Sequence, residues 1–224
     1  MKITWFGHSA VMIEDKYKIL IDPFIEGNPA TNVNKDDLKP DLILVTHGHG
    51  DHLGNAIEIA KKNDVPVIAI YELAEYLSSK GVNSIGMNFS GTFDFNGIKI
   101  TMVYALHTAG ISEDNFQHSG GLPCGYIING SKSLYHAGDT GLFGDMELIG
   151  KIYHPEISML PIGGFFTMGI KEAVYASKLL KSKYIIPIHY NTFDVIKQDP
   201  EDLKRDLKGI ADVIIFKPGE TKEL

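Results

Sequence analysis

The ten residues Val45–Gly54 read VTHGHGDHLG and place His47, His49, Asp51 and His52 within six consecutive positions. They directly follow an apolar run that is typical of a buried strand. Residues two apart in an extended segment project to the same side, so the first two histidines can place their imidazoles on a common point. The glycines leave room, and a turn into a helix brings the aspartate and the third histidine back to the same region. Because imidazole and carboxylate groups suit zinc, iron and manganese, this segment predicts a metal site rather than a loop of solvated histidines.

Three other apolar strand patterns also end in a histidine or an aspartate. IKITMVYALH ends at His107, KSLYHAGD ends at Asp139, and KYIIPIH ends at His189. Loops fixed by a rigid sheet are where binding groups are best positioned, so we expect these side chains to meet the histidine-rich segment. With the four donors of the histidine-rich segment, these three side chains make seven. One tetrahedral zinc uses only three or four donors. The full set divides between two ions about 3.5–4 Å apart with a bridging carboxylate, which predicts a binuclear site.

Strand and helix patterns alternate along the rest of the chain, and no linker, charge block or repeat marks a boundary. We therefore expect one α/β domain over residues 1–224, with a mixed sheet or two sheets. Two β-hairpins with Asn-Gly turns are expected mid-chain, at residues 91–103 and 124–136. Strands are predicted at 2–6, 10–13, 18–21, 42–46, 65–70, 157–161, 184–188 and 212–216, and helices at 55–62, 72–79, 170–180 and 200–207.

Composition restricts the class of partner. The formal net charge is -7 and no Lys/Arg cluster is present, which argues against a protein that wraps nucleic acid. Cys124 is the only cysteine and cannot form an intramolecular disulfide. The N-terminus enters a strand pattern without a signal-peptide segment, and no apolar run approaches the roughly 20 residues that span a bilayer. We expect a cytoplasmic protein that acts on a small molecule without binding a membrane.

Five segments resemble one known family. WFGHSAVMIE, ILIDPFIEGNP, VTHGHGDHLGNA, YHAGDTGLFGDM and LPIGGFFTMG are similar to the UPF0173 group of metal-dependent hydrolases. This group belongs to the metallo-β-lactamase superfamily and is related to the ascorbate-6-phosphate lactonases. The similarity covers essentially the whole chain and implies a four-layer αββα sandwich with the site on one edge. It further implies that His47, His49 and His107 hold one metal, that Asp51, His52 and His189 hold the second, and that Asp139 bridges them.

The resemblance also gives expectations for residues around the metals. Asp22 matches a position that supports the site from behind the ligands, whereas the residues alone leave a turn or cap before Pro23 equally open. His8 matches a histidine near the active site, although a lone histidine is more often structural. From the residues themselves, the paired glycines including Gly164 could form a pocket wall with Phe165, Phe166 and Met168, although ordinary core packing by the last two is equally open. Related sequences are expected to carry a polar residue where Phe165 stands.

Two regions remain to be placed. Residues 108–126 have the polar, glycine-rich composition of a loop over a site. His118 within this loop could touch substrate or be solvated. We interpret His136, inside a strand pattern, as a hydrogen-bonded core residue and His154 as a surface residue.

The expected chemistry is hydrolysis. Divalent metals lower the pKa of a bound water toward about 7, and the resulting hydroxide would attack a small ester, lactone or similar substrate. By analogy with superfamily relatives, Asp51 would orient the nucleophile or pass a proton to the leaving group. Zinc is the first expectation for the two divalent ions, and manganese, iron and nickel also suit the donors.

Two other functions stay open from the sequence. One is phosphodiester cleavage, of the nuclease or phospholipase kind, because two-metal sites also support in-line displacement at phosphorus. The other is a non-catalytic metal-binding scaffold or sensor. Homo-oligomers are common among such enzymes, but the sequence carries no interface signature.

Overall fold

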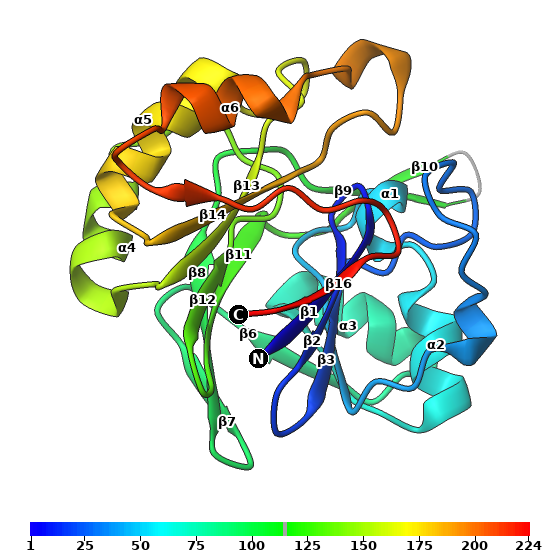
Figure 1. Ribbon diagram of the computed structural model, residues 1–224. Helices are drawn as coiled ribbons and strands as arrows, with labels where there is room; N and C mark the ends of the chain where they lie inside the picture. Colours follow the sequence, from blue (N-terminus) through cyan, green and yellow to red (C-terminus); the bar gives the residue numbers. More distant parts are fainter. Residues whose placement is uncertain (114–115) are drawn as a thin grey trace.

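Two β-sheets pack face to face between two outer layers of helices in the computed structural model, which describes residues 1–113 and 116–224 (Figure 1). The blue to cyan half of the chain builds one sheet with its helices, and the green to orange half builds the other. The C-terminal strand, drawn in red, returns to the first sheet. This arrangement confirms the expected four-layer αββα sandwich.

The first sheet combines an antiparallel meander with a parallel half. Strands β1, β2 and β3 pair antiparallel, and β3 through β6 pair parallel. The spatial order is β16-β1-β2-β3-β4-β5-β6. Its strands are β1 (Lys2–Gly7), β2 (Ala10–Glu14), β3 (Lys18–Ile21), β4 (Leu42–Leu44), β5 (Val67–Ile70), β6 (Ser84–Met87) and β16 (Thr221–Glu223).

The second sheet has the same mixed character. Strands β7, β8, β11 and β12 pair antiparallel, and β12 through β15 pair parallel, in the order β15-β14-β13-β12-β11-β8-β7. Its strands are β7 (Thr92–Phe95), β8 (Ile98–Tyr104), β11 (Cys124–Asn129), β12 (Ser133–His136), β13 (Ile157–Pro161), β14 (Tyr184–Ile188) and β15 (Asp212–Val213).

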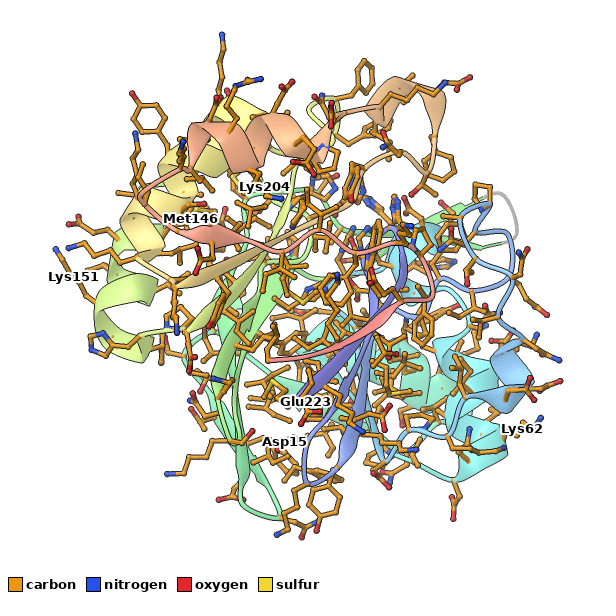
Figure 2. The ribbon with its side chains drawn as sticks, in the orientation of Figure 1. Asp15, Lys62, Met146, Lys151, Lys204 and Glu223 are labelled. Atoms are coloured by element: carbon orange, nitrogen blue, oxygen red, sulfur yellow. The ribbon has the colours of Figure 1, made fainter. Side chains whose placement is uncertain are left out.

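The helices cover the outer faces of the sheets with their apolar sides, and charged side chains such as Lys62 and Lys151 project away from the molecule (Figure 2). Helix α6 begins where sequence chemistry predicts, because Asp199 caps the backbone N–H of Glu201 and Pro200 occupies the first turn. No helix within the two described ranges is long and apolar enough to cross a membrane. The helices are α1 (Gly50–Leu53), α2 (Ala56–Asn63), α3 (Tyr71–Ser79), α4 (Met146–Tyr153), α5 (Ile170–Leu180) and α6 (Pro200–Asp206), with short 3-10 turns at Lys35–Asp37 and Asp194–Ile196.

Two buried residues of β11 fasten the sheets to each other next to the histidine-rich segment. The Tyr126 hydroxyl on β11 donates to the carbonyl oxygen of Val45 at 2.9 Å and lies 3.2 Å from that of Ile68. The backbone N–H of Cys124 donates to the carbonyl oxygen of Thr46 at 3.0 Å. These bonds fix the end of β4, after which the histidine-rich segment begins, against the second sheet.

Some local predictions need correction. Residues 108–126 are not wholly a loop, because β9 (Gly110–Glu113) and β10 (Phe116–Ser119) pair as a separate two-stranded sheet; residues 114–115 of this segment lie outside the described residues. The last predicted strand is shorter than expected and covers only β15. Helix α4 and strands β6 and β16 were not predicted. The two strands have four residues or fewer, which carry too little pattern.

Candidate metal centre

Three strands of each sheet end at one common edge, and a histidine or aspartate follows each of them. Since β1, β3 and β4 share one direction, as do β8, β12 and β14, their carboxyl ends lie together. Helix α1 follows β4 and adds Asp51 and His52. The strand-end residues are His8, Asp22 and His47 in the first sheet and His107, Asp139 and His189 in the second.

The donor atoms fall into three overlapping groups whose members lie within 4.8 Å of one another. The first group matches the set expected for one ion, and the second contains the set expected for the other together with His8. Overlap between the groups places the two sets side by side, as a binuclear site requires. The groups are His47, His49 and His107; His8, Asp51, His52 and His189; and His47, His52 and Asp139.

Asp139 occupies the middle of the cluster. Its Oδ2 atom lies 3.0 Å from Nε2 of His189, 3.3 Å from Nε2 of His52 and 3.6 Å from Nε2 of His107. Its Oδ1 atom is buried and has no hydrogen-bond partner among the described residues. Although burial opposes ionisation, the imidazoles of His52 and His189 outweigh it and hold the pKa of Asp139 well below its ordinary value. An ionised carboxylate at this place suits a bridging ligand.

Asp22 determines which ring nitrogen of two histidines faces the cluster. Its Oδ2 atom accepts from Nδ1 of His52 at 2.8 Å and from the Thr46 hydroxyl at 2.7 Å. Because the Thr46 hydroxyl donates its only proton to Asp22, it must accept the hydrogen bond from Nδ1 of His47, at 3.0 Å. Both histidines therefore carry their proton on Nδ1 and present the lone pair of Nε2 to the site. This buried carboxylate supports the site from behind, rather than serving only as a turn residue before Pro23.

The protonation states of the cluster fit divalent cations. Burial lowers the pKa values of His47, His49 and His107, which keeps their rings neutral and their lone pairs available. Burial also opposes protonation of His52, but the carboxylates of Asp139 and Asp22 outweigh it and raise its pKa well above 6.5. The raised pKa reflects the negative charge that Asp139 and Asp22 place around His52, and this charge would equally favour a divalent cation at Nε2. Nε2 of His52 and Oδ1 of Asp139 are both buried without a hydrogen-bond partner among the described residues, which fits two atoms that would serve as metal donors.

Asp51 is held by His8. The Asp51 carboxylate accepts a hydrogen bond from Nε2 of His8 at 3.1 Å, and Nδ1 of His8 lies 3.0 Å from the hydroxyl of Thr192. Burial lowers the pKa of His8 to about 4, so the ring is neutral at pH 7 and donates through Nε2. The backbone also fixes His8, since its carbonyl oxygen accepts from the Trp5 indole and from the N–H of His189, each at 2.9 Å.

A cavity of about 290 Å³ opens onto the cluster. At roughly 30 Å³ per water molecule this is room for a small molecule. Phe166 forms part of its wall, whereas Phe165 is 68% exposed and lies outside the lining. Gly164 shapes the turn before them with a φ of +82°. The cavity is lined by His49, Asp51, His107, Thr108, Asp139, Phe166 and His189.

The remaining histidines lie outside this cavity lining. His136 is buried, with Nε2 donating to the carbonyl oxygen of Ser9 at 3.1 Å and Nδ1 accepting from the N–H of Gly138 at 3.2 Å, which confirms a core role. His118 lies exposed on β10, and His154 is exposed at the end of α4.

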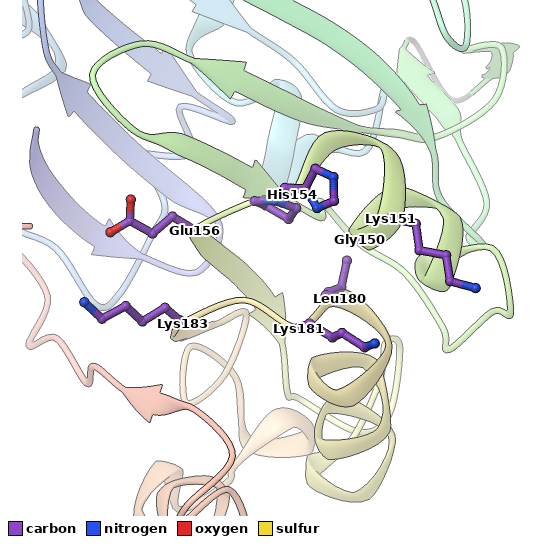
Figure 3. A pocket seen from close by; sticks show the side chains of 8 residues that line it. Gly150, Lys151, His154, Glu156, Leu180, Lys181 and Lys183 are labelled. Carbon is purple, nitrogen blue, oxygen red and sulfur yellow. The ribbon is translucent and has the colours of Figure 1, made fainter.

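A second cavity, of about 300 Å³, is lined by Lys151, Lys181 and Lys183 together with Glu156 (Figure 3). Glu156 and Lys183 immediately precede β13 and β14, so this cavity lies at the opposite edge of the sheet from the metal cluster. Its lysines accompany the ends of α4 and α5, where cations complement the helix dipole. We therefore interpret this cavity as a surface feature of the helical layer.

Side chains that position the metal donors were missed from the sequence. Thr46 immediately precedes His47, and Thr192 comes three residues after His189, but threonine is too common for either position to stand out. Their roles depend on contacts between distant segments. The one sequence feature that could have indicated such a role is the position of Thr46 directly before His47.

Gly54 ends helix α1 in a conformation that excludes other residues. Its φ is +43°, and a Cβ atom there would lie 2.5 Å from the carbonyl oxygen of Pro23. The next N–H, of Asn55, donates to that same oxygen at 2.9 Å. We expect Gly54→Ala to lower the free energy of unfolding by about 2–4 kcal/mol through strain and overpacking, measured by chemical denaturation.

Gly50 provides a matched control in the same helix. A Cβ atom at Gly50 would meet nothing within 4 Å, so Gly50→Ala should change the free energy of unfolding by no more than about 0.5 kcal/mol. Equal effects of the two substitutions would contradict a role for the Gly54 contact with Pro23.

Comparisons with known proteins agree with this architecture. A family model for the Beta-lactamase superfamily domain matches residues 17–190. UPF0173 metal-dependent hydrolases from Methanosarcina barkeri and Methanosarcina mazei are 54% and 52% identical to this chain, covering 100% of it and 99% of each relative. The solved structure of Igni18, a metallo hydrolase from Ignicoccus hospitalis, is 38% identical with a TM-score of 0.91, covering 100% of this chain and 98% of that one. This chain therefore belongs to the UPF0173 metal-dependent hydrolases of the beta-lactamase superfamily.

Proposed function

We propose that this protein hydrolyses a small ester, lactone or similar molecule at a centre of two divalent ions. The observation that carries the proposal is the meeting of seven donor side chains from both sheets beside one cavity, with two of the histidines oriented by Asp22. His47, His49 and His107 would hold one ion, and Asp51, His52 and His189 the other. Asp139 would contact both.

When bound, the ions would polarise the substrate carbonyl and lower the pKa of a water molecule toward about 7, which supplies a nucleophile at neutral pH. The protein supplies rigid positioning. The buried Asp22 keeps Nε2 of His47 and His52 directed at the cluster, and the backbone of His8 fixes the end of β14 that carries His189. Such preorganisation lets the reacting groups meet without rearrangement.

Asp51 is the residue that we assign to orienting the nucleophile. Its side chain is 33% exposed and lines the cavity, so it can contact both a ligand and the buried cluster. The hydrogen bond from His8 engages Oδ2 and leaves Oδ1 for a further contact. Loss of His8 should therefore affect turnover through the position of Asp51 and not through direct chemistry.

The test is a screen of metal-loaded protein against lactones, thioesters, carboxylic esters and phosphodiesters. We expect turnover of carboxylic esters or lactones. His49→Ala should lower the turnover rate at least about a hundredfold, because mutating even the residues that support metal ligands lowers metal affinity or activity 10- to 100-fold. His154→Ala, which changes an exposed histidine at the opposite edge, should leave the rate unchanged.

Three outcomes contradict the proposal. Turnover of phosphodiesters alone would favour phosphodiester cleavage as the function. Equal rates in both histidine variants would place the reaction outside the cluster. Tight metal occupancy without turnover of any substrate would favour the scaffold or sensor.

A further inference from the structure

Phe166 lines the cavity that opens onto the metal cluster, and two phenylalanines from other loops, Phe24 and Phe193, pack against His8. Phe166 follows β13 and forms part of the cavity wall, although 53% of its surface is exposed. Phe193 follows β14 and is 37% exposed, and Phe24, which follows β3, is partly buried. Single exposed phenylalanines are ordinary, but here one lines the cavity and two pack on the histidine that is bonded to the cavity-lining Asp51.

His8 places Phe24 and Phe193 next to the catalytic groups. Both rings meet the His8 imidazole edge-on, with centroid distances of 5.7 Å for Phe24 and 5.5 Å for Phe193. The two phenyl rings lie 6.4 Å apart. Nε2 of His8 is bonded to Asp51, which lines the cavity. Only His8 therefore separates these two phenyl rings from Asp51, the side chain that would orient the nucleophile.

The described wall of the same cavity includes neither lysine nor arginine. Apart from the metal donors, it offers Thr108 and the ring of Phe166. A phosphate or carboxylate on the substrate, away from the reacting carbonyl, would need cationic or N–H partners to replace its hydration. Phenyl rings supply neither, whereas they bind alkyl and aryl groups by excluding water.

We propose that the substrate carries an uncharged apolar group, alkyl or aryl, which packs against Phe166, Phe193 and Phe24 while its carbonyl reaches the metal cluster. This inference rests on the proposed function, because it assigns the substrate class of that same site. Small-molecule sites are usually lined mainly by apolar side chains, with a few polar groups that orient the ligand.

The experiment measures binding of hydroxamates, which chelate metals, to the metal-loaded holoprotein by calorimetry. Octanohydroxamate should bind at least about tenfold tighter than acetohydroxamate, since each fully buried methylene contributes about fourfold. A hydroxamate of the same length that ends in a carboxylate should lose most of this gain. Phe166→Ala and Phe193→Ala should weaken octanohydroxamate binding about tenfold and leave acetohydroxamate within twofold.

Tyr175→Ala is the matched control, because Tyr175 is an aromatic residue 62% exposed on the outer helix α5 and should change neither affinity. Equal affinities for the short, long and charged hydroxamates would overturn the inference, as would phenylalanine variants that behave like the control.

Turnover is measured separately with p-nitrophenyl acetate and octanoate. A chain-length preference in binding without hydrolysis of either ester or of any lactone would contradict the proposed function and leave the apolar ligand class supported. Hydrolysis of both esters without a preference in binding or rate would support the function and overturn the ligand class.

Discussion

Asp139→Asn is expected to abolish binuclear metal binding and to lower turnover by more than about a hundredfold. The residue lies within 3.6 Å of Nε2 atoms from three histidines, and an amide cannot bridge two cations as a carboxylate does. Mutating the residues that support metal ligands lowers metal affinity or activity 10- to 100-fold, so loss of the central ligand should lower both further. Elemental analysis after dialysis gives the metal content per chain, and a rate measured at saturating metal shows whether excess ion restores activity.

The control for this change is Asp145→Asn. Asp145 is exposed six residues further along the chain and makes no capping bond to α4, so its variant should keep full metal content and turnover. Two ions per chain in Asp139→Asn would contradict the bridging role.

Asp22→Asn is expected to weaken metal binding about 10- to 100-fold without removing any ligand. An amide nitrogen in place of Oδ2 would face two donors, the Thr46 hydroxyl and Nδ1 of His52. His52 would then move its proton to Nε2 and lose the lone pair that faces Asp139. The buried hydrogen bonds that are lost should also lower the free energy of unfolding by about 1–3 kcal/mol. Calorimetric metal titration and chemical denaturation measure the two effects.

Thr46→Val separates the two branches of this network. It keeps the bond between Asp22 and His52 but removes the hydroxyl that fixes His47. We therefore expect it to weaken only the ion held by His47, His49 and His107, whereas Asp22→Asn weakens both. In a Co²⁺ titration followed by visible absorption, identical loss of both binding steps in the two variants would contradict this division.

The sequence predicted which candidate donors would meet because their chemistry is local to strand ends. HxHxDH gives four of them in one segment, and His107, Asp139 and His189 each follow an apolar run of β-forming residues. Since the carboxyl ends of parallel strands meet at one edge, the direction of the chain alone brings such residues together. The αββα layers, by contrast, were implied by the family resemblance, because periodicity does not tell one mixed sheet from two.

Other features depend on contacts that no local pattern encodes. The hydrogen bond between His8 and Asp51 joins residues 43 positions apart, and that between His8 and Thr192 joins residues 184 apart. Strand β16 pairs with β1 although its residues, TKE, have no strand pattern of their own. Phe166 lines the cavity and its neighbour Phe165 does not, a difference that adjacent phenylalanines do not reveal in sequence.

The origin of the donors in both sheets has a thermodynamic consequence for the whole molecule. An ion held jointly by the first and second sheets binds the folded chain and not the separated halves, so occupancy and folding are linked equilibria. Each tenfold rise of free metal above the dissociation constant should add about 1.4 kcal/mol to the unfolding free energy per site. A chelator should accordingly lower the melting temperature, and the cluster edge of the sandwich should be the first place where amide hydrogens exchange faster.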